Sequence, residues 1–177
     1  MGPAAAQPAA SSDTTMQRQR PHPNPVTPSE KFQAAIEAGT RTRSGAPGPN
    51  YWTNTAHYTL DATVHPSSNM LRGRGTIRYH NNSPDTLRRV VLHLRQNIHK
   101  EGAPRNRPAE LTGGMTLDSL RIRGRAPLQE IQSRRQLQRL GQGYQVSDTR
   151  LVVALPAPLP PTDSTTLEVG WHFRIPG

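Results

Sequence analysis

Residues 58–80 read YTLDATVHPSSNMLRGRGTIRYH, and this stretch decides the fold. Apolar and polar side chains alternate before and after the cluster 65–69, HPSSN, which is typical of a turn. Side chains that alternate in this way lie on opposite faces of a strand. The stretch therefore predicts a β-hairpin with one dry and one wet face. The apolar set is Tyr58, Leu60, Ala62, Val64, Leu71, Gly73, Gly75, Ile77 and Tyr79, and Arg72, Arg74, Thr76, Arg78 and His80 alternate with its second half.

Further short strands are predicted after this hairpin. Residues 81–85, NNSPD, form the next turn, and apolar side chains then mark strands over 90–94, 117–122, 149–155 and 165–173. We expect Pro156 to stop the strand before it and residues 156–161, PAPLPP, to be a connection, because proline donates no ladder hydrogen bond. At least six strands and almost no helix predict an all-β fold. We expect an antiparallel β-sandwich or saddle-shaped sheet with at most one or two short helices.

The N-terminal part of the chain has a different composition. Residues 1–28 are rich in Pro, Ala, Ser, Thr and Gln, which predicts a disordered leader. Residues 29–39, SEKFQAAIEAG, predict one short helix, with a serine as its N-cap and a glycine after its last turn. We therefore divide the chain into a leader, 1–40, and a β domain, 41–177. The segment 124–142, GRAPLQEIQSRRQLQRLGQ, fits either a helical turn or two or a long basic loop.

The sequence leaves the cellular compartment open. The chain has no cysteine, which excludes disulfides and thiolate chemistry. It has no run of 18 apolar residues, so we expect no membrane span. The leader lacks the basic and apolar regions of a complete signal peptide. The protein is periplasmic or secreted if the leader is the remnant of a signal peptide, and cytoplasmic otherwise.

No stretch of the sequence has the pattern of a catalytic or metal site. Zinc hydrolases usually place two histidines four residues apart on a helix with a glutamate between them, and no histidine pair here has that spacing. No G-x-S-x-G elbow is present, although a Ser–His–Asp cluster is recognised only by geometry. Gly73-Arg-Gly75 lies inside a strand and predicts a place where a large side chain or another backbone approaches closely. We therefore expect no catalytic, cofactor-binding or metal-binding residue in this chain.

The charge suggests a second hypothesis. The chain carries a net charge of +10, and 20 of its 22 basic residues are arginine. A stand-alone basic β module that binds nucleic acid or an acidic surface is therefore the alternative. Single-stranded nucleic acid also calls for aromatic side chains among the charges. Tyr58, Tyr79, Trp171 and Phe173 all fall on apolar faces, which disfavours nucleic acid.

Six stretches resemble the N-terminal domain of bacterial zinc aminopeptidases of the aminopeptidase N type, a gluzincin family. They lie in the order of that domain and together span roughly residues 41–177. The first resembles a G-x-P-G-x-x-Y-W entry segment, the third a G-x-x-x-I-x-Y-x-N-N-S-P-D hairpin, and the last a W-x-F-x-I-P close. The six are GAPGPNYW (45–52), YTLDATV (58–64), LRGRGTIRYHNNSPD (71–85), LRRVVLHLRQN (87–97), TRLVVALPAPL (149–159) and LEVGWHFRIP (167–176).

The resemblance implies a non-catalytic, saddle-shaped β domain that packs against and supports a zinc-containing catalytic domain. In that family the catalytic domain carries a G-x-M-E-N segment and an H-E-x-x-H zinc site, and neither motif occurs here, where Gly114-Met115 is followed by Thr116. The resemblance further implies that the β domain is incomplete at its C-terminal end. It implies that the partner is a catalytic domain of the same polypeptide, and that peptide substrate is reached only through that domain. We expect no peptidase activity from this chain alone, no cofactor in it, and zinc in the missing domain.

Overall fold

The structure is a computed structural model that describes residues 27–177, so residues 1–26 of the predicted leader lie outside the described residues. The described residues fall into two compact units, one that ends at Pro49 and one that spans Asn50–Gly177. In the first unit, helix α1 spans Glu30–Glu37. The side chain of Ser29 caps it by accepting a hydrogen bond from the Phe32 amide, which is the cap that the sequence predicts.

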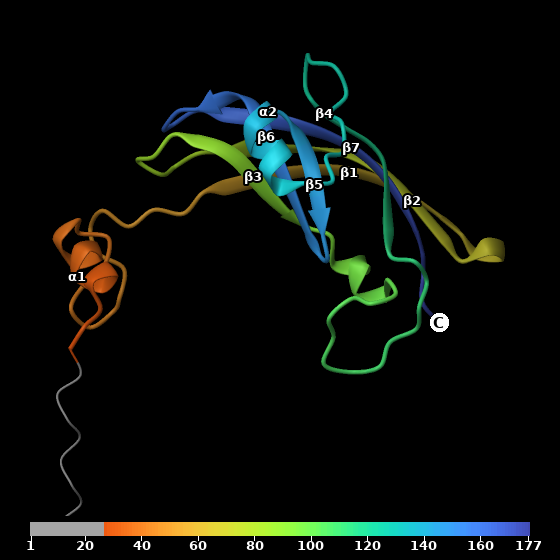
Figure 1. Ribbon diagram of the computed structural model, residues 1–177, viewed down its shortest axis with the longest axis horizontal. Coiled ribbons are helices and arrows are strands. Elements are labelled where there is room, and N and C mark those ends of the chain that lie inside the picture. Colours follow the sequence, from red (N-terminus) through yellow and green to blue (C-terminus); the bar gives the residue numbers. More distant parts are fainter. Residues whose placement is uncertain (1–26) are drawn as a thin grey trace, which may run out of the picture. The chain divides into compact units, whose positions relative to one another are not determined.

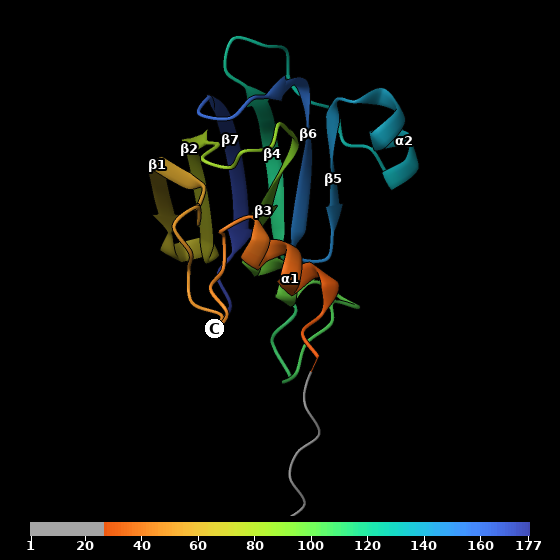
Figure 2. The ribbon, with the colours of Figure 1, turned by 90° about the vertical axis from the view of Figure 1, so that its left-hand side faces the viewer.

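The second unit contains a four-stranded antiparallel sheet in the order β1-β2-β7-β4, seen side by side in Figure 2. The hairpin predicted from residues 58–80 is confirmed, with Tyr58 opposite Ile77 and Leu60 opposite Gly75. A short 3-10 helix, η1 (Pro66–Ser68), turns the chain between the first two strands. The strands are β1 (Thr55–His65), β2 (Met70–His80), β4 (Met115–Ile122) and β7 (Ser164–Arg174).

A three-stranded antiparallel sheet, in the order β3-β6-β5, packs on one face of the first and lies in front of it in Figure 1. Its strands are β3 (Leu87–His93), β5 (Gly143–Ser147) and β6 (Arg150–Leu159). Helix α2 (Arg134–Leu140) lies beside β5, and the 3-10 helix η2 (Arg95–His99) follows β3. The predicted antiparallel all-β fold is therefore confirmed. None of the helices within 27–177 is long and apolar enough to span a membrane.

The hydrophobic core lies between the two sheets. The four-stranded sheet contributes one apolar side chain from β2, two from β4 and one from β7. The rest come from β3 and β6 and from Leu94, which directly follows β3. Burial of this apolar surface is the main force that holds the sheets together. The fully or largely buried members are Ile77, Val90, Leu94, Leu120, Ile122, Leu151, Val153, Leu155, Leu159 and Leu167.

Two buried asparagines fasten the loops to this core. Asn81 is fully buried, and its Nδ2 donates to the carbonyl oxygens of Asp85, Leu159 and Pro160 over 2.8–3.1 Å. Its Oδ1 accepts from the amide and hydroxyl of Ser83. Asn97 is equally buried, donating to the Asp148 carbonyl and accepting from the Met115 amide. Buried amides with partners for both their donors and acceptors fix loop geometry without an unsatisfied polar group.

Two sequence predictions about the second sheet need correction. Pro156 does not stop its strand, because β6 continues through 156–158 to Leu159. The pairing with β5 ends at Ala154, so beyond that residue β6 is an edge strand, where proline is tolerated. The short strand β5 was not predicted. The ambiguous segment 124–142 contains α2, which is the helical alternative.

Candidate functional site

One half of the inner face of the four-stranded sheet is apolar and is not covered by the second sheet. The register aligns Val64, Leu71 and Phe173 in one cross-strand row and Ala62, Gly73 and Trp171 in the next. Residues opposite each other in an antiparallel pair project from the same face. Figure 1 shows the β1–β2 hairpin extending beyond the three-stranded sheet. We call this surface the apolar face; its large side chains are Tyr58, Leu60, Val64, Leu71, Trp171 and Phe173.

The exposure of these side chains separates them from the core. Tyr58 is 58% exposed, Leu60 is 56% exposed and Val64 is 51% exposed, whereas Ile77, directly opposite Tyr58, is 7% exposed. Leu71, Trp171 and Phe173 are half-buried and do not belong to the core cluster. A contiguous exposed apolar patch is uncommon on a soluble monomer and marks a surface that meets a partner.

Two glycines in β2 leave room for large apolar side chains to pack directly on the backbone of the apolar face. A Cβ built on Gly73 would lie 2.4 Å from Cζ2 of Trp171, so the indole closely approaches the backbone there. A Cβ on Gly75 would lie 2.5 Å from Cδ2 of Leu60, which leans across the strand. The close approach predicted for Gly73-Arg-Gly75 is confirmed. The two glycines let a tryptophan and a leucine lie over the sheet, and no charged side chain interrupts the hairpin face.

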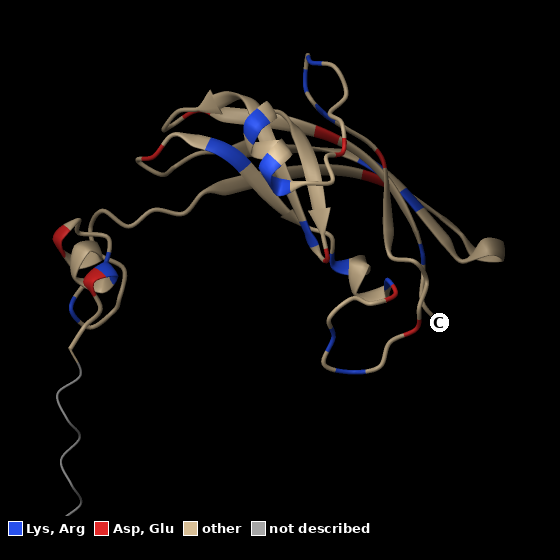
Figure 3. Ribbon diagram, viewed as in Figure 1, with Lys and Arg blue, Asp and Glu red and all other residues tan. Residues whose placement is uncertain are grey.

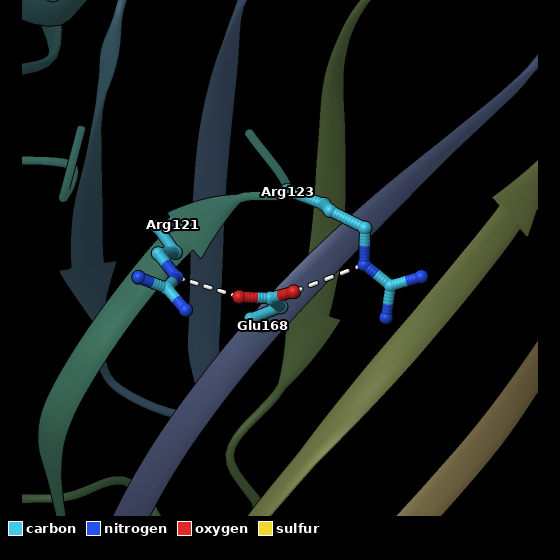
Figure 4. A network of polar contacts seen from close by, with 3 residues as sticks. All are labelled: Arg121, Arg123 and Glu168. Carbon is cyan, nitrogen blue, oxygen red and sulfur yellow. Dashed lines mark hydrogen bonds and ion pairs between the residues drawn. The ribbon is translucent and has the colours of Figure 1, made fainter. Parts of the chain in front are cut away.

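The opposite face of the same sheet is polar, and some of its charges are paired. Arg74 binds Asp61 at 3.2 Å, across the β1–β2 pair. Glu168 binds Arg121 at 2.6 Å and Arg123 at 3.0 Å, as Figure 4 shows. Hydrogen bonds from Arg123 and Arg121 lower the pKa of the Glu168 carboxyl. This face is therefore adapted to water, and the apolar face is not.

The structure brings together one histidine and one carboxylate on the polar face. His172 Nδ1 lies 2.7 Å from Oδ1 of Asp118, the extra residue of a β-bulge in β4. Among residues 27–177, no serine or threonine hydroxyl is hydrogen-bonded to His172. In the same residues, no group of three or more His, Cys, Asp or Glu is placed to hold a metal ion. These residues therefore do not fit a zinc site, and His22 lies outside them.

The other histidines of the sequence are not brought together into a site. His57 and His65 project from the polar side of β1, His80 ends β2, and His93 is exposed at the end of β3. His99 Nδ1 contacts the carbonyl oxygen of Glu110 at 2.8 Å. The alternation in the sequence predicts which side chains lie on the inner face of the four-stranded sheet. It does not predict which half of that inner face the second sheet leaves uncovered.

Comparison with known proteins gave structural matches alone. No family model matches the chain, and no curated protein sequence matches it. Three similar solved structures are M1 zinc metallopeptidase mutants: two from Deinococcus radiodurans, one of them bound to a Tyr-Ser-Ala substrate, and a two-domain M1 zinc metallopeptidase bound to L-tryptophan. Each is 17% identical, with a TM-score of 0.44 over 73% of this chain. The chain spans 22% of the length of those proteins.

Proposed function

We propose that this chain is the non-catalytic N-terminal β domain of a zinc metallo-aminopeptidase, a class that removes N-terminal residues from peptides. Its apolar face packs against the catalytic domain of that enzyme. The observation that carries the proposal is the row of exposed apolar side chains Tyr58, Leu60 and Val64 on one side of β1. The six stretches that resemble the first domain of this enzyme class support it independently.

The two faces of the four-stranded sheet support a packing role. On the polar face, the ion pair between Arg74 and Asp61 remains largely in water, with side chains 82% and 68% exposed. Such pairs contribute at most about 1 kcal/mol each and need no partner. The large side chains of the apolar face carry no charge that could interact with water in this way. Covering it with a second domain removes apolar surface from water and stabilises both domains.

The proposed role leaves the chemistry to the partner. In this proposal the catalytic domain supplies both the zinc and the general base. The β domain contributes a rigid wall on one side of that domain, supports its stability and helps shape access to its active site. Peptide substrate then meets this chain only through the catalytic domain.

The gene and the purified chain provide the first test. We expect the reading frame beyond codon 177 to encode an H-E-x-x-H segment. We also expect the purified chain, with zinc added, to hydrolyse a fluorogenic aminoacyl substrate no faster than buffer does. A stop codon without a neighbouring catalytic domain, or turnover that follows this chain through purification, would contradict the proposal.

The interface itself is tested with neighbouring residues of β1 that face opposite ways. Leu60→Asp places a charge on the apolar face, and Thr59→Asp places the same charge on the polar face. Both side chains are exposed, so both variants should fold. We expect Leu60→Asp to weaken binding to the separately expressed catalytic domain by about tenfold or more, because a buried unpaired charge is costly. Thr59→Asp should bind like the unmodified chain; equal binding by both variants would rule out the apolar face.

A further inference from the structure

A second surface lies on the outer side of the three-stranded sheet, away from the apolar face. A groove of about 1240 Å³ runs there between α2 and β3. The register places Val91 of β3 directly opposite Val152 of β6, on the side of the sheet that faces away from the core. These two valines, with Ala154, form an apolar floor, and Leu140 of α2 adds an exposed apolar side chain at 47% exposure.

Four arginines border this floor. Arg88 and Arg89 come from β3, Arg134 from α2 and Arg150 from β6, and all four are exposed. Figure 3 marks basic residues on both β3 and α2. None of the residues that line the groove is Asp or Glu. Within residues 27–177, none of these four arginines makes an ion pair, in contrast to the arginines of the four-stranded sheet that bind Asp61 and Glu168.

We propose that this groove binds an acidic, amphipathic segment of a partner protein. Apolar side chains of the segment would lie on Val91 and Val152, and its carboxylates would pair with the arginines along both walls. Guanidinium groups bind carboxylates through two parallel hydrogen bonds, which gives geometric selectivity as well as attraction. A groove with an apolar floor and unpaired charges of one sign is complementary to a segment that has both features.

The lining favours a protein segment over a nucleic acid. Proteins that bind single strands stack bases on exposed aromatic rings set among the charges. The lining has a single aromatic residue, Tyr79, which is half-buried and packs against the core. The floor is instead aliphatic, which suits leucine or valine side chains. This inference goes beyond the proposed packing role, because it concerns the other sheet and does not depend on a catalytic domain.

Fluorescence anisotropy on the full chain tests the proposal with four labelled probes. These are a short peptide rich in glutamate and leucine, its version with serine for leucine, its version with lysine for glutamate, and an oligothymidylate. We expect saturable binding of the first peptide alone, with an affinity that falls as salt is added. Equal binding of the serine version would contradict the role of the apolar floor, and tighter binding of the oligothymidylate would overturn the choice of partner.

Charge-reversal variants locate the site. The pair Arg89→Glu and Arg134→Glu should weaken binding of the glutamate–leucine peptide by about tenfold or more, as expected when interfacial charge pairs are lost. The matched control is Arg72→Glu with Arg125→Glu, which changes the net charge equally at exposed positions outside the groove. Val91→Ser tests the floor without changing charge. Equal losses in both charge-reversed pairs would show unspecific attraction and overturn the proposal.

Discussion

The indole of Trp171 in β7 lies against the backbone of Gly73 in β2, where a Cβ would stand 2.4 Å from the ring. Gly73→Ala should therefore destabilise the domain by about 1–3 kcal/mol, because the ring must move or the strands must shift. Chemical denaturation followed by tryptophan fluorescence and circular dichroism measures this cost. In a Trp171→Leu background the same change should cost clearly less, since the clash is removed. An unchanged cost in that background would contradict the contact.

Asn81 should be among the least replaceable polar residues of the chain. Asn81→Ala removes a buried amide that serves three carbonyl oxygens and the Ser83 hydroxyl. We expect a loss of roughly 2–4 kcal/mol in the free energy of unfolding, because the buried groups lose their partners. Asn106→Ala, at an exposed loop position, is the control and should change stability by less than about 0.5 kcal/mol. Similar losses in both variants would contradict this role.

Glu168 makes stability depend on acid pH. Its pKa is lowered in the folded chain by hydrogen bonds from Arg123 and Arg121. The unfolded chain therefore takes up a proton first as pH falls through the usual glutamate value of about 4.3. The stabilising contribution is complete above that value and is lost as pH falls through the lower pKa of the folded state.

The carboxyl carbon of Glu168, followed by NMR, reports this titration directly. Replacing both arginines by alanine should raise the pKa toward the usual value, and Glu168→Gln should remove the corresponding loss of thermal stability in acid. If the carboxyl titrates at the same pH with and without Arg121 and Arg123, the two hydrogen bonds are not the cause.

Leu60 should contribute little to the stability of the isolated domain. Leu60→Ser changes a side chain that is 56% exposed, so the free energy of unfolding should shift by no more than about 0.5 kcal/mol. Solubility should rise and binding of the dye ANS should fall, because the apolar face becomes smaller. Ile77→Ser, opposite Tyr58 in the core, should instead unfold the domain or nearly so. A large loss of stability with Leu60→Ser would mean that the face is already used within the domain.

Local patterns in the sequence were enough to predict the antiparallel fold. Alternation around residues 58–80 predicted both strands of the first hairpin and the correct face for each side chain, because period-two patterns are a local property of a strand. The strand β5, GYQVS, was missed because five residues with two apolar side chains show no clear period. The prediction that Pro156 stops its strand was wrong because it also rested on local sequence alone. Whether a proline stops a strand depends on where its neighbour ends, which is a non-local fact.

The candidate surfaces depended even more on tertiary structure. Leu60 and Ile77 belong to the same alternating pattern, yet the first is 56% exposed and the second 7% exposed. The difference arises from how far the three-stranded sheet extends over the four-stranded one, and no local pattern encodes that extent. The groove beside α2 likewise combines arginines from three elements separated along the chain. Composition revealed the excess of arginine but not which of them would remain unpaired.

Strand β1 lies at the border of its sheet and, within residues 27–177, pairs only with β2. The backbone N–H and C=O groups on the outer side of this eleven-residue strand are therefore open to pairing with another extended chain. In a crowded solution the nearest such chain is another copy of the same molecule. Concentration, more than heat, should thus limit how long the isolated domain stays monomeric, and light scattering should rise steeply as the protein is concentrated at constant temperature.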